Sequence, residues 1–405
     1  MARSLGLSAY LAFARRQPPN LEQITGERPG GQVVWMHASD AARAHVLAQV
    51  GVRLASQRGR TGLILTTPPD HPLPRALPKG VLHVSCPSEN PTDIRAFLDH
   101  WQPDLCLWQG PWLRPSLIDA THRRGVPQML LDADEPALAH KRWRLVPEPI
   151  KGTLPLFDAI LSHSDEAATR LSRLAPVADR MHKSGPILED SPALPCNDTD
   201  LEELSTALGG RPVWFASQIH PHELRPILMA HRSVLKLAHR TLLVITPDDP
   251  AEAQAIRDLC RKERWHIASW DDGEIPEANT QILLSEDKRE LGLWYRVAPV
   301  TLMGCSMVSG QGGRNPLEAA ALGSAVLYGP GVRDYLDSYS RLAQAGAARI
   351  VKDADSLTAA LGLVSAPDQA ASMAHAGWEV VSEGAEVADQ IIAMAQDLLD
   401  TRDAS

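Results

Sequence analysis

Short apolar runs alternate with amphipathic stretches of helical period along almost the whole chain from residue 32 onward. Each run ends at glycine, proline or a polar cluster, as a buried strand does. Between the runs, apolar residues recur at every third or fourth position, which is typical of helices that cover a sheet. The pattern predicts strands at 33–39, 61–67, 81–86, 104–110, 126–134 and 159–164, and a second series at 213–218, 241–247, 266–270, 280–286, 297–303, 325–328 and 348–353.

Strands that alternate with helices predict parallel sheets with helices on both faces, the α/β class. Prolines, acidic residues and a Gly-Gly pair interrupt the series at 186–212, so we expect two doubly wound, Rossmann-like domains that face each other across a cleft. The expected division is a short amphipathic N-terminal segment at 1–30, a first domain at 31–190, a linker at 191–212, a second domain at 213–370 and C-terminal helices at 371–405. The helical tail is expected to cross back over the first domain.

The composition of the chain argues against some classes of binding partner. The 405 residues are 44% hydrophobic and 22% charged, which is typical of a globular protein. The formal net charge of −9 gives no broad basic surface, which argues against DNA or RNA as a partner. Five scattered cysteines without CxxC spacing indicate free thiols in a reducing compartment and no structural zinc site. They are Cys86, Cys106, Cys196, Cys260 and Cys305.

The N-terminal stretch Leu5–Ala14 is mostly apolar and is followed by Arg15 and Arg16. It is about half as long as the roughly 20 residues that a membrane-spanning helix needs. The arginines and prolines that follow it also differ from the pattern of a cleaved signal peptide. Two interpretations remain: a short segment packed on the body of the protein, or one that lies in a membrane interface.

A glycine-rich loop follows the expected strand at 297–303 and leads into a helix that begins near Asn315. In open α/β sheets ligands bind at the carboxyl ends of the strands, and the N–H groups of a helix N-terminus favour an anion. Asn315 is a good N-cap and Pro316 suits the first helical turn. Glu318 therefore has two interpretations: it closes a capping box, or it accepts hydrogen bonds from both hydroxyls of a ribose.

The chain resembles the bacterial 3-deoxy-D-manno-octulosonic acid (Kdo) transferases. The stretch LGLWYRVAPVTLMGCSMVSGQGGRNPLEAAALGSAVLYGP at 291–330 is similar, nearly position by position, to the family's segment around its G-G-H-N-P-L-E motif. VVWMHAS at 33–39 resembles its W-x-H-A-S turn, and PDLCLW at 103–108, followed by Pro115, is similar to a P-D-L…E-T-E-L-W-P segment. FASQIHPHE at 215–223 keeps two residues of a further turn, His220 and Glu223.

The resemblance implies a GT-B fold and a peripheral glycosyltransferase at the cytoplasmic face of the inner membrane. Such an enzyme transfers Kdo, or a related acidic sugar, from a CMP-activated donor to a lipid A precursor or related glycolipid in lipopolysaccharide biosynthesis. It needs no cofactor beyond the CMP-sugar. No metal site is expected either, because His220 and His222 lack a third ligand in the sequence.

The resemblance also implies how CMP is held. Asp248 stands where the family carries arginine after a proline, so a phosphate-facing cation has become a carboxylate that weakens phosphate binding. Arg314 stands where the family carries histidine, and it is either the replacement cation or a solvated loop residue. The expected nucleotide-binding residues are Pro247, Asp248, Lys288, Arg289, Glu290, Gly312, Gly313, Arg314, Asn315, Pro316, Leu317 and Glu318.

The catalytic positions of the first domain depart from the family pattern. Ala42 stands where the family has a glutamate that acts as general base. The family's paired glutamates fall on Gly110 and Trp112, and a lysine of the family falls on Leu188. Alanine cannot accept a proton, and loss of a general base costs about 10²–10⁴ in rate, so an active enzyme needs a replacement.

Asp40 is the candidate replacement base, and its alternative role is the N-cap of the helix that begins at Ala41. Asp134 and Glu135, in the turn after the strand at 126–134, are further acids expected in the cleft, together with His220 and Glu223. Two functions therefore stay open. The chain is a divergent transferase with a different base, or a catalytically degenerate relative that binds nucleotide or partner enzymes in a regulatory role.

Overall fold

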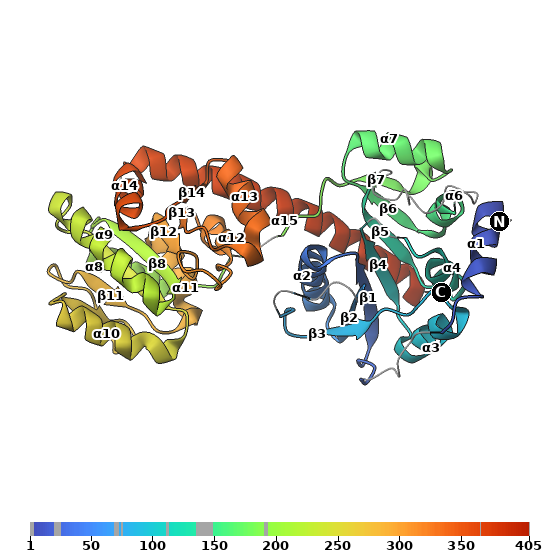
Figure 1. Ribbon diagram of the computed structural model, residues 1–405, viewed down its shortest axis with the longest axis horizontal. Coiled ribbons are helices and arrows are strands. Elements are labelled where there is room, and N and C mark those ends of the chain that lie inside the picture. Colours follow the sequence, from blue (N-terminus) through green and yellow to red (C-terminus); the bar gives the residue numbers. More distant parts are fainter. Residues whose placement is uncertain are drawn as a thin grey trace. The chain divides into compact units, whose positions relative to one another are not determined.

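The protein consists of two compact α/β units (Figure 1). Unit 1 comprises Met1–Asp190 and Gly384–Ser405, and unit 2 comprises Ser191–Glu383. The computed structural model describes residues 4–19, 26–68, 73, 76–110, 113–134, 149–189, 193–364 and 366–404. Each unit is built on a seven-stranded, wholly parallel sheet, so the predicted fold class, α/β with two doubly wound domains, is confirmed.

The sheet of unit 1 has the strand order β3-β2-β1-β4-β5-β6-β7. The chain leaves β1 toward one edge and returns to its other side at β4, so the topological switch point lies between these two strands. The strands are β1 (Gln32–Ala38), β2 (Thr61–Thr67), β3 (Val81–Ser85), β4 (Leu105–Gln109), β5 (Gln128–Ala133), β6 (Ala159–Ser162) and β7 (Met181–Lys183).

Helices cover both faces of this sheet (Figure 1). One core cluster joins the sheet to α3 and α4 through Trp35, Phe97 and Leu117, and the other joins it to α2 and the end of α15. Among the described residues before 190, the helices are α1 (Leu5–Ala14), α2 (Ala41–Arg58), α3 (Pro91–Trp101), α4 (Pro115–Arg123), α6 (Ile150–Thr153) and α7 (Asp165–Leu174), with 3₁₀ turns at Leu154–Leu156 and Ala178–Arg180.

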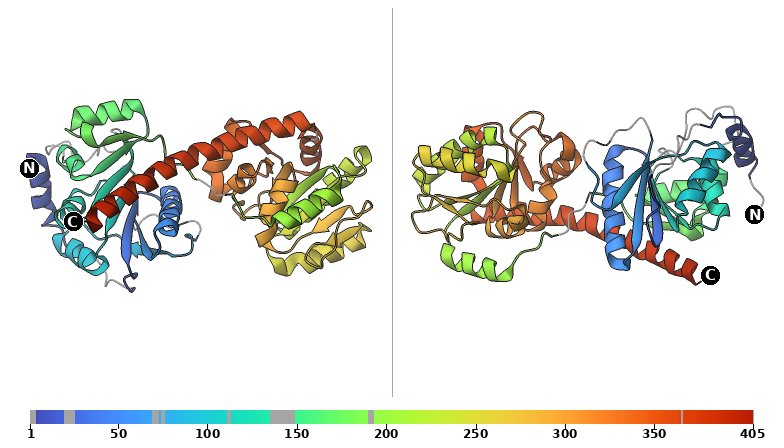
Figure 2. Two further views of the ribbon diagram at one scale, coloured as in Figure 1. Left: turned by 180° about the vertical axis from the view of Figure 1, so that it is seen from behind. Right: turned by 90° about the horizontal axis from the view of Figure 1, so that it is seen from below.

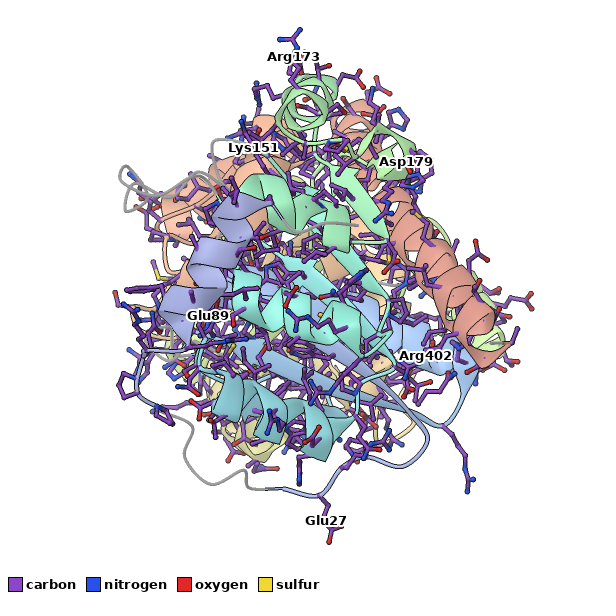
Figure 3. All side chains as sticks on the ribbon, turned by 90° about the vertical axis from the view of Figure 1, so that its right-hand side faces the viewer. Glu27, Glu89, Lys151, Arg173, Asp179 and Arg402 are labelled. Carbon is purple, nitrogen blue, oxygen red and sulfur yellow. The ribbon has the colours of Figure 1, made fainter. Side chains whose placement is uncertain are left out.

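Helix α1 packs on unit 1 through the buried residues Leu7, Tyr10 and Ala14. The Tyr10 hydroxyl donates a hydrogen bond to Glu89, which Figure 3 labels beside this helix. Leu5 and Phe13, on the outward side, remain 85% and 56% exposed. The segment therefore packs on the body of the protein, the first of its two predicted interpretations, and still presents apolar side chains to its surroundings.

The sheet of unit 2 has the order β10-β11-β9-β8-β12-β13-β14, with its switch point between β8 and β12. Its strands are β8 (Val213–Ile219), β9 (Leu242–Pro247), β10 (Ile267–Ser269), β11 (Ile282–Leu284), β12 (Val300–Met303), β13 (Ala325–Tyr328) and β14 (Ala348–Ile350). The run predicted as a strand at 297–303 begins later, because Val297 still belongs to the preceding helix and only residues from Val300 pair with β8 and β13.

Helices again cover both faces of the sheet. One core cluster unites α9, α10 and α14 with the sheet, and the other unites α8, α11, α12 and α13. The helices are α8 (Asp198–Leu208), α9 (Leu224–Leu237), α10 (Ala253–Lys262), α11 (Leu291–Val297), α12 (Pro316–Ala321), α13 (Leu336–Gln344) and α14 (Ala354–Val364), with 3₁₀ turns at Pro221–Glu223, Pro250–Glu252, Lys288–Glu290 and Arg333–Tyr335. Helix α8 lies within the stretch predicted as a linker, and its Leu204 and Leu208 belong to this core.

The C-terminal tail is one unbroken helix, α15 (Pro367–Asp403), where several helices were predicted (Figure 2). Its first part contributes Val381 to the core of unit 2, and its last part contributes Ile391, Ile392 and Leu399 to the core of unit 1. Arg402, labelled in Figure 3, donates to the carbonyl oxygens of residues 103 and 104 in unit 1. Both units thus complete their cores with residues from the same helix.

Candidate functional site

The loops after β8 and β12 leave neighbouring strands at the switch point of unit 2, where open α/β sheets bind ligands. Glu223, in the 3₁₀ turn after β8, is buried and joins the two loops. Its carboxylate accepts backbone N–H groups of Cys305 (2.7 Å), Ser306 (2.9 Å) and Met307 (2.7 Å) in the loop after β12, and that of His220 at 2.9 Å. Glu223 therefore holds the glycine-rich loop in place.

His220 belongs to the same arrangement. It is the N-cap of the 3₁₀ turn Pro221–Glu223, and its Nδ1 accepts the backbone N–H of His222 at 3.3 Å. The side chain of His220 and the carboxylate of Glu223 close a capping box. Both residues were expected in the cleft, and the structure gives both a role in shaping the loops after β8 and β12.

Two glycines of the loop are needed for its shape. Gly312 has φ +79°, and a Cβ there would lie 2.0 Å from Oδ2 of Asp334. Gly313 has φ +80° and packs against the backbone of Val332. Because left-handed φ values and such close approaches exclude most side chains, glycine at both positions lets the loop fold back before α12.

Asn315 caps α12 as predicted, since its side-chain oxygen accepts the N–H of Leu317 at 3.1 Å. The capping box, one of the two interpretations of Glu318, is not formed: the carboxylate accepts no hydrogen bond from any residue that the structure describes. Glu318 is half-buried, and burial raises its pKa from 4.5 to about 7, against the opposing charge of Lys288. A partly desolvated carboxylate without a donor is available to a ligand.

Asp248 forms ion pairs with both cations of the site. Its Oδ1 lies 2.7 Å from Nε of Arg314 and 3.2 Å from Nζ of Lys288, and Nη2 of Arg314 contacts the second oxygen. Burial acts to raise the pKa of Asp248, but the hydrogen bonds and charges of Arg314 and Lys288 outweigh it, so the pKa is lowered. The three side chains together carry one net positive charge.

The remaining predicted nucleotide residues lie around this group. Pro247 ends β9 and is buried, directly before Asp248. Arg289 is exposed and pairs with Asp287, its Nε lying 2.7 Å from Oδ2. In Glu290, burial and then the acidic neighbours Asp200 and Asp287 raise the carboxyl pKa. The structure therefore brings Asp248, Lys288, Arg314 and Glu318 together, with Arg289 directed to a different partner.

In unit 1 the switch point lies between β1 and β4, and Asp40 lies two residues after the end of β1. Asp40 is the N-cap of α2: Oδ1 accepts the N–H of Arg43 at 2.9 Å, and Oδ2 accepts the Ser39 hydroxyl at 3.1 Å and contacts the Arg43 guanidinium. Burial acts to raise the pKa of Asp40, but these hydrogen bonds and the charge of Arg43 lower it overall. The N-cap interpretation is confirmed.

The other acids predicted in unit 1 lie elsewhere or outside the described residues. Asp134 pairs with Arg170 of α7, Nη2 to Oδ1 at 2.6 Å. Glu135 and Trp112 lie outside the residues that the structure describes.

At Gly110, where φ is +110°, a Cβ would lie 2.1 Å from Oγ of Ser39. The packing at this position therefore excludes a glutamate.

Asp132, in β5, is an acid of this region that the sequence pattern did not single out. Its φ is +57°, at a register irregularity between β5 and β6, and its side chain is 15% exposed. Nε of Arg43 lies 3.9 Å from Oδ2 of Asp132. An acid inside the apolar run QMLLDA was the only signal in the sequence, and the irregularity that turns its side chain toward Arg43 depends on strand pairing.

The described residues hold no group of three or more metal-ligating side chains, and all five cysteines are free thiols. No helix in the part of the chain that the structure describes is both long and apolar enough to cross a bilayer.

Comparison with known proteins identifies several that this chain resembles in sequence. A model of the family described as 3-deoxy-D-manno-octulosonic-acid transferase (kdotransferase) matches residues 11–190. The 3-deoxy-D-manno-octulosonic acid transferase of Haemophilus influenzae is 26% identical over 75% of this chain and 71% of its own length. That of Bordetella pertussis is 28% identical over 87% of this chain and 84% of its own.

Two solved structures are also similar in part. The C-terminal CMP-Kdo binding domain of WaaA from Acinetobacter baumannii is 23% identical, covers 45% of this chain and 98% of that domain, and has a TM-score of 0.41. MurG from Acinetobacter baumannii is 14% identical, covers 91% of this chain and all of its own, and has a TM-score of 0.46.

Proposed function

We propose that this chain, a divergent member of the Kdo transferase family, transfers Kdo or a related acidic sugar from a CMP-activated donor to a lipid A-type acceptor. The observation that carries the proposal is Glu318. It lies in the stretch most similar to the family, it is half-buried, and no described residue donates a hydrogen bond to it. Two vicinal ribose hydroxyls would supply the donors that this carboxylate lacks.

The charges around Glu318 suit the same ligand. Arg314 and Lys288 share Asp248, so the group retains one net positive charge. The phosphodiester of a CMP-sugar carries one negative charge, and it would be balanced at that group. The carboxylate of Glu318 would then lie toward the uncharged ribose, where it costs less electrostatically than it would beside the phosphate.

Calorimetric titration of CMP tests the donor half of the proposal. Loss of a charged acceptor for ribose hydroxyls is worth about 1.5–3 kcal/mol, so Glu318→Ala should weaken CMP binding about 10- to 150-fold. Glu203→Ala is the matched control, because Glu203 is an exposed glutamate of α8 in the same unit. Absence of CMP binding by the wild-type protein would remove the proposal, and equal binding by both variants would remove the role of Glu318.

A second function is favoured by one specific observation. Ala42 cannot accept a proton, and the packing at Gly110 excludes a glutamate, so this chain could bind nucleotide without transferring sugar and act by regulating partner enzymes. Complementation of a strain that lacks its own Kdo transferase separates the two functions. Growth restored by this chain supports transfer, and CMP binding without growth supports the regulatory role.

We further propose that α1 attaches the enzyme to the cytoplasmic face of the inner membrane. Leu5 and Phe13 are exposed on the helix that packs on unit 1, and the exposed Arg15 and Arg16 follow it, which complements an anionic lipid surface. Sedimentation with vesicles that contain anionic lipid should fall for Phe13→Ser and stay unchanged for Leu363→Ser, an equally exposed residue of unit 2. Equal sedimentation of both variants would contradict the attachment.

A further inference from the structure

The proposed transfer needs a group that accepts the proton of the incoming hydroxyl, and the positions that the family uses for carboxylates cannot supply one in this chain. Ala42 has no ionisable group, and a side chain at Gly110 would collide with Ser39. Asp40 uses both of its oxygens to cap α2 and to bind Arg43 and Ser39. A different acid at the carboxyl ends of β1, β4 and β5 is therefore required.

Asp132 meets the geometric requirement. It lies next to the end of β5, and the pairing of β5 with β6 shifts register between Leu130 and Ala133. At this shift Asp132 adopts φ +57°, a left-handed conformation that aspartate tolerates better than most residues do. Irregularities of this kind redirect a side chain and occur often next to active sites.

The surroundings of Asp132 include a charge partner and a fixed donor. Arg43 of α2 approaches it to 3.9 Å, and the backbone N–H of Ile187 donates to its carboxylate. The side chain is 15% exposed, so a substrate hydroxyl can reach it. Burial raises the pKa of Asp132, against the opposing charge of Arg43, whereas the pKa of Asp40 is lowered. Of these two acids, Asp132 is the stronger base.

Gln109 provides an independent indication that a ligand binds here. It ends β4, lies beside Asp132 and is fully buried. Its side-chain oxygen accepts no hydrogen bond from a described residue, whereas its amide nitrogen is directed to the carboxylate of Asp132. Leaving a buried polar atom unpaired costs about 1–3 kcal/mol, so an amide oxygen in this state is expected where a ligand supplies the missing donor.

We propose that Asp132 is the proton acceptor for the incoming hydroxyl and that Gln109 binds the same acceptor sugar, an inference that rests on the proposed transferase function. In the step, the O–H bond of the acceptor breaks and its proton moves to an Oδ of Asp132. The hydroxyl oxygen forms a bond to the anomeric carbon of the donor sugar, and the bond from that carbon to the phosphate oxygen breaks. Its electron pair leaves with CMP, and Asp132 then releases the proton to water.

The test is a steady-state transfer assay with CMP-Kdo and a lipid A precursor, together with calorimetry of CMP. Asp132→Asn should lower kcat about 10²–10⁴-fold and leave CMP affinity unchanged, because CMP is assigned to unit 2. Asparagine also tolerates the left-handed conformation, so the fold should persist, which circular dichroism can check. Asp132→Glu, which keeps a carboxylate, should recover part of the rate. Gln109→Leu should raise KM for the acceptor.

Two further variants of unit 1 serve as a control and as a test of the alternative base. Asp179→Asn is the matched control, since Asp179 is an exposed aspartate in the same unit, labelled in Figure 3, and its kcat should equal that of the wild type. Asp40→Asn should lower kcat at most about tenfold, because asparagine also caps α2 and only the ion pair with Arg43 is lost. Wild-type transfer that survives Asp132→Asn, or a larger loss for Asp40→Asn than for Asp132→Asn, would overturn the assignment of Asp132 alone. Absence of wild-type transfer would overturn both this assignment and the proposed function.

Discussion

Replacing Glu318 with glutamine is expected to stabilise unit 2 above neutral pH. The wild-type carboxylate is half-buried and accepts no hydrogen bond from a described residue, and burial raises its pKa from 4.5 to about 7. A group whose pKa is higher in the folded state contributes stability below its unfolded pKa and loses that contribution as pH rises through its folded pKa. The charged form of Glu318 therefore destabilises the fold increasingly between pH 4.5 and 7.

The expected gain in the free energy of unfolding follows from the raised pKa of Glu318. A difference of one pKa unit is worth about 1.36 kcal/mol, so the rise at Glu318 corresponds to about 3 kcal/mol as an upper bound. Partial solvent access reduces this to on the order of 1–3 kcal/mol. For a unit of this size the gain raises the midpoint of thermal unfolding by about 2–10 °C. A neutral amide of the same shape avoids the cost, because it is never ionised.

The assay is differential scanning calorimetry of wild type and Glu318→Gln at pH 5 and pH 8, without ligand. The variant should unfold at a higher temperature at pH 8, and the difference should shrink toward zero at pH 5, where the wild-type carboxyl is mostly protonated. Glu203→Gln, at an exposed position of the same unit, should show no difference at either pH. Equal midpoints at pH 8, or a gap of the same size at both pH values, would refute the reasoning.

Three further predictions concern the charges and the core. Glu223→Gln should lower the free energy of unfolding of unit 2 by about 2–4 kcal/mol in denaturant titration, because an amide cannot accept all the N–H groups that the carboxylate binds. Unchanged stability would contradict the role of Glu223 in holding the loop after β12. Asp248→Asn should tighten CMP binding about 3- to 30-fold at low salt by releasing Arg314 and Lys288, and calorimetry at two salt concentrations should show the gain shrinking as salt rises. Ile391→Ala should lower the free energy of unfolding of unit 1 by about 2–5 kcal/mol, which calorimetry should show in one of two unfolding transitions. CMP should shift the other transition, that of unit 2, so a loss confined to the CMP-shifted transition would argue against Ile391 as part of the core of unit 1.

The strands were predictable because each corresponds to a local pattern of apolar residues in the sequence. A buried parallel strand is a continuous apolar run, and the helices between the strands carry their own period. Asn315 and Asp40 were also predictable as caps, because a cap depends on residues within one helical turn. The position of Val297 was harder, since the apolar run crosses from a helix into a strand without a break.

The charged groups were less predictable because their partners are distant in the sequence. Glu223 binds a loop more than 80 residues away, and Asp248 pairs with Arg314 across 66 residues. The conformation of Asp132 depends on how β5 pairs with β6, and a single sequence does not record that register. Local pattern therefore located the loops that hold the site, whereas the role of each charge within it follows from tertiary contacts.

The sharing of α15 affects the order in which the chain folds on the ribosome. Most of unit 1 precedes unit 2 in the chain, but unit 1 lacks the apolar face of Gly384–Ser405 until those residues have been synthesised. At roughly 5–20 residues per second, residues 191–405 take about 10–40 s to follow residue 190, and the sheet face beneath Ile391 and Leu399 stays uncovered during that time. Unit 2 ends at Glu383, so all of its residues are present before the segment that completes the core of unit 1.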